Sequence, residues 1–207
     1  MSIEIKEENG TATIKLNDDK WNTYITKFLK QNDIKVSEKN NTITFKTDSI
    51  ISLHDLLKKE ETLDYLSVVN LLNSLAMQLE YLEKQNLYLF ALDSKDITVI
   101  NNTIFIYTNF DNIYKINDDK QFLLEKQHNC EQFCSPEMIN GEKYITIKST
   151  YYVVASFLIY CLFQIDVSKF EEQKIFETLE PIYYTRLYYF LLRCLIKDSK
   201  KRFFIFI

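Results

Sequence analysis

The stretch NCEQFCSPEMINGEKYITIKSTYYVVASFLIYCLF, residues 129–163, decides the fold of this chain. It holds a Ser-Pro-Glu triplet at 135–137, then a polar loop with Gly141, one of only two glycines, and then an apolar run with almost no polar face. The run from Tyr151 to Phe163 is shorter than the roughly 20 residues that a membrane-spanning helix needs. We therefore predict a helix surrounded by protein.

The composition is that of a globular protein. With 207 residues, 46% of them hydrophobic, the chain can bury roughly 70% of its unfolded surface. The scarcity of glycine argues against sandwiches and glycine-rich phosphate loops. The net charge is −4 with interspersed signs, which predicts no nucleic-acid partner. With no export signal, we expect a cytoplasmic protein with reduced cysteines and no membrane segment.

The first 50 residues read as a small strand-rich part. Residues 3–16 alternate and turn at Asn9-Gly10, which predicts a β-hairpin. Residues 18–31 have helical spacing, with Asp18 or Asp19 as the cap, and residues 33–47 form a second hairpin candidate that turns at Asn40-Asn41.

The remaining chain reads as mostly helical. Ser52 is a candidate N-cap for a short helix, and residues 63–86 predict a long amphipathic helix. A hairpin turning at Asn101-Asn102 and a loop over 111–135 follow, and then helices at about 147–163, 170–180 and 183–197. The expected buried stripe of the long helix consists of Leu66, Val69, Leu72, Leu75, Leu79 and Leu82. This order predicts an α+β fold.

Several local strings resemble protein kinases. FCSPEMI, residues 133–139, resembles the Ala/Ser-Pro-Glu segment that ends the kinase activation loop, and residues 145–163 resemble the buried central helix of the large lobe. LLRCLIKDSKKRFFIFI, residues 191–207, resembles the end of the kinase domain, and residues 75–90 resemble the helix that leads to the catalytic loop. The chain is therefore similar to the protein kinase superfamily, as a degenerate member.

The resemblance implies a two-lobe fold. Residues 1–50 would be a reduced, β-rich N-lobe, and residues 51–207 a helical C-lobe. It also implies that Glu137 and Arg202 form the buried ion pair that kinases make between these two segments. The amino-acid composition resembles that of proteins from AT-rich genomes. A large DNA virus is therefore the expected source.

The residues that phosphoryl transfer needs are mostly absent. Phosphoryl transfer depends on charge neutralisation and positioning, yet only Gly10 precedes Gly141, so no Gly-rich loop is present. Lys15 in TATIK matches the kinase strand lysine, but the following helix segment, residues 20–31, offers no acidic partner; an exposed strand lysine is an equal interpretation.

Kinase catalytic-loop positions fall in FALDSKDITVI, residues 90–100. The favoured register matches Phe90-Ala91-Leu92 with His-Arg-Asp and Ile97 with the metal-binding Asn. A shift of one residue places Asp93 at the position of the base and Thr98 at the position of the Asn. Leucine cannot accept a proton, and isoleucine cannot bind Mg²⁺.

Asp-Phe-Gly, the kinase metal-binding motif, is replaced here by Asn109-Phe110-Asp111, and Thr150 stands where active kinases carry the Asp that opens the central helix. The sequence thus predicts a pseudokinase without catalytic residues, cofactor or metal, which acts by binding a protein partner. One alternative is an atypical kinase that uses Lys15, Asp93, Asn109 and Asp111 in displaced roles. Another is a structural or virion component.

Three further features have mainly structural interpretations. His128, Cys130 and Cys134 supply three zinc-ligand types, but a structural zinc site needs four, and ordinary loop thiols are the favoured reading. His54 is expected on a helix surface. The aromatic cluster PIYYTRLYYFLL, residues 181–192, is expected to pack in the lower lobe, with a partner surface as the alternative.

Overall fold

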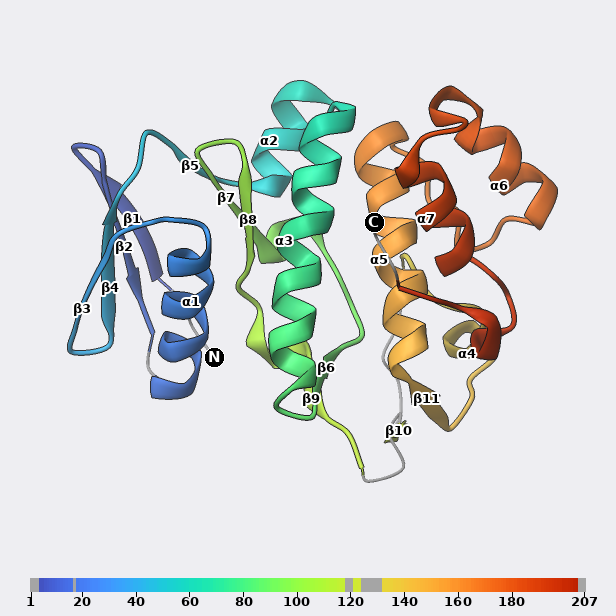
Figure 1. Ribbon diagram of the computed structural model, residues 1–207, viewed down its shortest axis with the longest axis horizontal. Helices are drawn as coiled ribbons and strands as arrows, with labels where there is room; N and C mark the ends of the chain where they lie inside the picture. The colour runs from blue at the N-terminus through green and yellow to red at the C-terminus, as the bar shows by residue number, and fades with distance from the viewer. Residues whose placement is uncertain (1–3, 17, 118–120, 124–131, 205–207) are drawn as a thin grey trace. The chain divides into compact units, whose positions relative to one another are not determined.

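The computed structural model describes residues 4–16, 18–117, 121–123 and 132–204, and it confirms the predicted α+β class. Helices alternate with small antiparallel sheets of two to four strands (Figure 1). The chain forms two compact units. The first comprises Met1–Gln85 and Asp93–Ile113, and the second comprises Asn86–Leu92 and Tyr114–Ile207.

A four-stranded antiparallel sheet opens the first unit. Its strand order is β1-β2-β4-β3, with the bounds β1 Glu4–Glu8, β2 Thr11–Lys15, β3 Val36–Lys39 and β4 Thr42–Lys46. The turns fall at Asn9-Gly10 and Asn40-Asn41, where the backbone φ angles are positive, a conformation that Asn and Gly tolerate. Both predicted hairpins are therefore confirmed.

Helix α1, Asp19–Gln31, packs on this sheet. The Asp18 side chain caps it by accepting a hydrogen bond from the Lys20 N–H at 2.8 Å, as the sequence predicted. Alternating residues of β2 and β4, including Ala12 and Ile14, are buried and form the inner face of the sheet.

A three-stranded sheet and two helices complete the first unit. The sheet order is β5-β7-β8, with the bounds β5 Ile50–Ser52, β7 Ile97–Ile100, β8 Ile104–Tyr107, α2 Leu53–Glu60 and α3 Tyr65–Glu83. Ser52 caps α2 by accepting from the Asp55 N–H at 3.0 Å. The predicted hairpin between β7 and β8 turns at Asn101-Asn102, where φ is again positive.

Helix α3 buries four of the six residues of the predicted stripe, and the prediction is wrong only at the start of the helix. Leu66, predicted to be buried, is 65% exposed, and Val69 is only half-buried. The buried side chains are Val68, Leu71, Leu72, Ser74, Leu75, Gln78, Leu79 and Leu82. Apolar spacing alone therefore misplaced the buried face at the start of the helix, where Val68 and Leu71 are buried in place of Leu66 and Val69.

Ser74 and Gln78 are buried, and their side chains form hydrogen bonds with the backbone of β8 along the edge that no other strand pairs. Ser74 Oγ accepts from the Phe105 N–H at 3.2 Å, and Gln78 accepts from the Tyr107 N–H at 2.8 Å and donates to the Phe105 carbonyl at 2.8 Å. An uncovered strand edge would leave these backbone groups unsatisfied. Helix α3 therefore covers that edge in place of another strand.

Over its described residues, the second unit contains two small sheets and four α-helices. The strands pair as β6-β9 and β10-β11, and the bounds are β6 Leu87–Leu89, β9 Ile113–Lys115, β10 Gln121–Leu123, α4 Pro136–Ile139, β11 Tyr144–Thr146, α5 Ile147–Phe163, α6 Glu172–Leu179 and α7 Arg186–Cys194. Two of these short strands, β9 and β10, lie in the segment that was predicted to be a loop.

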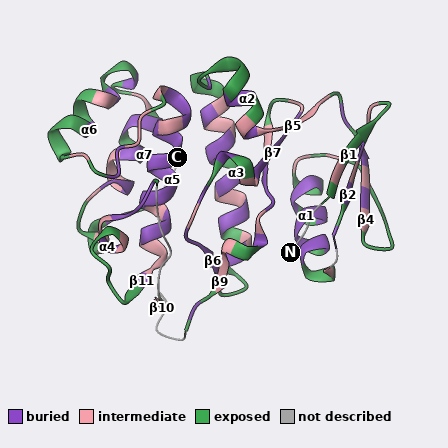
Figure 2. Cartoon of the chain, turned by 180° about the vertical axis from the view of Figure 1, so that it is seen from behind, coloured by how far each residue is buried: buried purple, intermediate pink, exposed green. Residues whose placement is uncertain are grey.

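Helix α5 is the buried helix that the sequence predicted. It is almost entirely buried, whereas α6 is largely exposed (Figure 2). Helix α7 packs along α5. Among the described residues, no helix has both the length and the apolar character that crossing a membrane requires.

Candidate functional site

Side chains at the catalytic-loop positions of the favoured register are apolar and buried. Leu92, which the sequence matched to the catalytic base of kinases, is 6% exposed, and Ile97, which it matched to the metal-binding Asn, is fully buried. Phe90 packs in an aromatic cluster of the second unit, where its ring stacks on Phe122 at 4.8 Å between centroids. These three side chains serve packing and offer no oxygen to a proton or a metal.

Asp93, the base candidate of the shifted register, lies at an exposed helix cap. It precedes the 3₁₀ helix η1, Ser94–Asp96, and its carboxylate accepts from the Lys95 N–H at 3.0 Å. Ser94 Oγ donates to the same carboxylate at 3.4 Å and lies 3.3 Å from His54 Nδ1. His54 lies on α2 and is half-buried against η1.

Asp96 is a half-buried carboxylate that sequence reasoning missed. Its Oδ1 accepts from Asn109 Nδ2 at 3.1 Å, and its backbone carbonyl accepts from the Thr108 N–H and hydroxyl. Burial raises the pKa of this carboxyl above its ordinary value. Asp96 directly precedes the predicted hairpin that turns at Asn101-Asn102 and Asn109 closely follows it, and this placement was the available signal.

Asn109, matched to the metal-binding Asp, is held by local hydrogen bonds. Its Nδ2 donates to Asp96, and its Oδ1 accepts from the Asp111 N–H at 3.2 Å and caps the 3₁₀ helix η2, Phe110–Asn112. Between these two residues, Phe110 is buried and stacks on Trp21 of α1, with centroids 4.2 Å apart. This segment is therefore anchored by an aromatic stack, and Asp111 itself is exposed.

Lys15 lies at the exposed end of β2. Since successive side chains of a strand alternate between faces, Lys15 shares the outer face with Thr11 and Thr13, opposite the buried Ala12 and Ile14. Its partners in the strand register are Glu4 of β1 and Thr42 of β4. The lysine thus faces away from the side of the sheet that α1 covers.

Metal-ligand types are not gathered in the described chain: over those residues, no three His, Cys, Asp or Glu side chains are placed to hold one ion. His128 and Cys130 lie outside the described residues. Cys134 is disulfide-bonded, so the expectation of reduced thiols is wrong for this residue. Cys161 and Cys194 are free and buried, and burial raises the pKa of Cys194 to about 12.

Glu137 and Arg202, which the sequence paired, lie in contact inside the second unit. The contact is bidentate: Arg202 Nη1 donates to Glu137 Oε1 at 2.6 Å, and Nη2 donates to Oε2 at 2.8 Å. Ser149 Oγ donates to Oε1 at 2.6 Å. Burial alone would raise the pKa of Glu137, but the hydrogen bonds from Arg202 and Ser149 outweigh it and lower the pKa.

Every N–H of the Arg202 guanidinium is satisfied, although the side chain is fully buried. Nε donates to the Ile196 carbonyl at 2.6 Å, Nη1 also donates to the Lys148 carbonyl at 3.1 Å, and Nη2 to the Lys197 carbonyl at 2.9 Å. Together with the two bonds to Glu137, these use all the donors of an arginine. Arg202 thereby joins α4, the start of α5 and the segment after α7.

Thr150 holds the segment that the sequence matched to the kinase catalytic loop. Its hydroxyl is buried on α5 and donates to the Leu89 carbonyl at 2.7 Å, one residue before Phe90. A carboxylate at this position could only accept hydrogen bonds, so a threonine that donates reverses the polarity of the bond.

We expect Thr150→Val to destabilise the protein by about 1–2 kcal/mol, because the substitution keeps the shape and removes the donor from a buried carbonyl. Urea denaturation measures the change. Thr150→Ser is the matched control, since it keeps the hydroxyl and should retain more of the stability. Equal losses in both variants would contradict a role for the hydrogen bond.

Comparison with known proteins adds no relative: no protein-family model matches the chain, and no curated protein matches it.

Proposed function

We propose that this protein is a pseudokinase: a kinase-like, two-lobe scaffold that transfers no phosphate and acts by binding another protein. Its lobes would be residues 1–50 and 51–207. Support for the scaffold comes from residues matched to the kinase framework. Glu137 and Arg202 form a buried bidentate pair, and Phe110, matched to the Phe of Asp-Phe-Gly, stacks on Trp21 of the first helix.

The observation that carries the loss of catalysis is the burial of Leu92 and Ile97. Phosphoryl transfer needs a group that positions the nucleophile and oxygens that hold Mg²⁺. At the two matched positions, this protein has the buried apolar side chains of Leu92 and Ile97 instead. Loss of a general base alone lowers the rate of a catalysed reaction by a factor of about 10²–10⁴.

An exposed tyrosine surface supports the binding role. Tyr183, Tyr184 and Tyr189 are 50%, 74% and 46% exposed, and the rings of Tyr183 and Tyr184 lie 4.0 Å apart. Tyrosine is enriched in protein interfaces because it combines a large rigid ring with a polar hydroxyl. This is the exposed part of the aromatic cluster that the sequence placed at residues 181–192.

Nucleotide binding separates this proposal from the atypical kinase that would use Lys15, Asp93, Asn109 and Asp111. We expect that adding ATP and Mg²⁺ leaves the melting temperature unchanged. The same absence of a shift is expected for Lys15→Ala. A nucleotide at 100 times its Kd would add about 2.7 kcal/mol of stability, or roughly 5–10 °C for a chain of this size. A shift of that size that disappears in Lys15→Ala would favour the atypical kinase over this proposal.

A structural or virion component is the remaining alternative. Affinity capture from the native cell distinguishes it from a regulatory binder: a single stoichiometric protein partner supports regulation, whereas co-purification with assembled particles supports a structural role. Substituting Tyr184 by Ala should weaken the capture of a regulatory partner without lowering the melting temperature, because Tyr184 contributes little to the core.

A further inference from the structure

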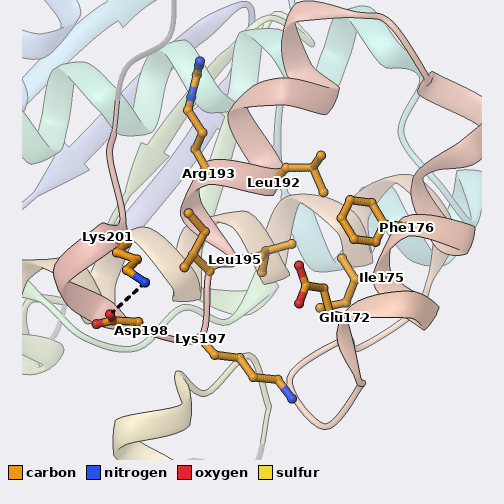
Figure 3. Close-up of a pocket in the computed structure, with 10 residues that line it drawn as sticks. Glu172, Ile175, Phe176, Leu192, Arg193, Leu195, Lys197, Asp198 and Lys201 are labelled. Atoms are coloured by element: carbon orange, nitrogen blue, oxygen red, sulfur yellow. Dashed lines mark ion pairs between the residues drawn. The ribbon is translucent and has the colours of Figure 1, made fainter.

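A pocket of about 390 Å³ lies in the second unit between α6, α7 and the segment that follows α7 (Figure 3). Its wall is apolar and is formed by side chains of both helices and of that segment, namely Ile175, Phe176, Leu192, Leu195 and Ile196. We call this the α6–α7 pocket. Its volume lies within the range of small-molecule sites, which combine an apolar wall with a few polar groups that orient the ligand.

One side of the α6–α7 pocket is fixed from behind by the buried guanidinium of Arg202. That guanidinium donates to the carbonyls of Ile196 and Lys197, at 2.6 and 2.9 Å, and both residues line the pocket. The backbone that carries the Lys197 side chain is therefore held in place before a ligand binds. Such pre-organisation lowers the entropy cost of binding.

Most of the charged side chains around the pocket are not available to a ligand. Asp198 and Lys201 form an ion pair with each other at 3.7 Å, and Arg193 extends away from the pocket (Figure 3). The charged side chains that remain are one acid on α6, Glu172, and one base after α7, Lys197.

Glu172 and Lys197 do not neutralise each other by pairing. Both side chains are exposed, and neither forms a hydrogen bond or an ion pair with any residue of the described chain. One carboxylate and one ammonium group therefore lie beside the same apolar wall. A ligand with a single charge would be attracted by one group and repelled by the other, whereas a ligand with both charges can be attracted by both.

Phe176 offers an aromatic ring to the ligand. The side chain is 39% exposed, and its ring forms part of the apolar wall (Figure 3). Aromatic rings attract one another in offset or edge-to-face arrangements beyond the effect of the area that they bury. The wall therefore suits a ligand whose apolar part is an aromatic ring.

We propose that the α6–α7 pocket binds a free α-amino acid with an aromatic side chain. The ring of the ligand packs on Phe176, its α-ammonium group faces Glu172, and its α-carboxylate faces Lys197. Free amino acids of this class carry an apolar group and two opposite charges on one small molecule. The inference uses neither the kinase resemblance nor nucleotide binding, so its failure would leave the proposed function untouched.

Titration of the full-length chain with L-phenylalanine, followed by NMR of the backbone amides, measures the binding. Two analogues each lack one charge: 2-phenylethylamine has no carboxylate, and 3-phenylpropanoate has no ammonium group. The wild type should bind phenylalanine more tightly than either analogue by a factor of roughly 2–5, which is what one exposed charge contact contributes. The amide signals that shift should be those of residues that line the pocket.

Two variants assign the charges of the ligand to their partners. Glu172→Gln should lose the preference for phenylalanine over 3-phenylpropanoate, and Lys197→Gln should lose the preference for phenylalanine over 2-phenylethylamine. Because both side chains are exposed, the melting temperature should not change. Glu171→Gln and Lys200→Gln are the matched controls, since they alter exposed neighbours of the same charge that do not line the pocket, and each should keep both preferences.

Three results would overturn the proposal. The first is a wild type that shows no saturable binding of phenylalanine. The second is equal affinity for N-acetyl-phenylalanine amide, which keeps the ring but carries neither charge and should bind more weakly. The third is a pair of preferences that persist in Glu172→Gln and Lys197→Gln at an unchanged melting temperature.

Discussion

Replacing Glu137 by alanine is expected to destabilise the protein by about 3–5 kcal/mol, because it leaves the fully buried guanidinium of Arg202 without its counter-charge. For a chain of this size, that loss lowers the melting temperature by roughly 6–20 °C. Urea denaturation followed by circular dichroism gives the free energy of unfolding directly.

Glu142→Ala is the matched control, because Glu142 is an exposed acid five residues further along the chain, and it should change stability little. A double variant, Glu137→Leu with Arg202→Met, should recover part of the loss, since it removes both charges together. An unchanged melting temperature in Glu137→Ala would show that the ion pair does not hold the second unit together.

The contribution of Glu137 should also depend on pH. Because its pKa is lower in the folded protein than in the unfolded chain, its stabilisation is complete above the ordinary carboxyl pKa and is lost as the pH falls through the folded-state value. The stability difference between the wild type and Glu137→Gln should therefore be constant around neutral pH and shrink in acid. A difference that grows on acidification would contradict this sign.

Gln78→Leu is expected to cost roughly 3–5 kcal/mol, because it removes four hydrogen bonds inside the first unit. The side chain accepts from the Tyr24 hydroxyl at 2.6 Å and makes the two bonds to β8, and it donates to the Ser74 carbonyl at 2.8 Å. Leucine fills a similar volume but leaves the Tyr24 hydroxyl and the edge of β8 buried without these partners.

Two further variants isolate the network. Tyr24→Phe removes one of the four bonds and should cost about 1 kcal/mol, and adding it to Gln78→Leu should cost less than the sum, because the two residues share a hydrogen bond. Gln85→Leu, at an exposed position after α3, is the control for the change of side chain. Additive losses from Tyr24→Phe and Gln78→Leu would contradict the shared bond.

Much of the local structure followed from the sequence alone. Asn-Gly and Asn-Asn dipeptides tolerate the positive φ angles of tight turns, and Asp18 and Ser52 cap helices through bonds to backbone groups two or three residues away. The apolar run at 151–163 predicted a buried helix, and α5 is that helix. These features depend on interactions within a few residues, so spacing and residue type are sufficient to find them.

Tertiary structure decided the rest. Gln78 lies in a helix, yet its partners are on Tyr24 and on β8, and Asp96 meets Asn109 across a hairpin. The exposure of Leu66 depended on which face of α3 the edge of β8 needed for its hydrogen bonds. Arg202 holds the segment after α7 against Glu137, 65 residues away in sequence. Hydrogen-bond geometry and burial between such distant residues are properties of the folded chain, and no local pattern encodes them.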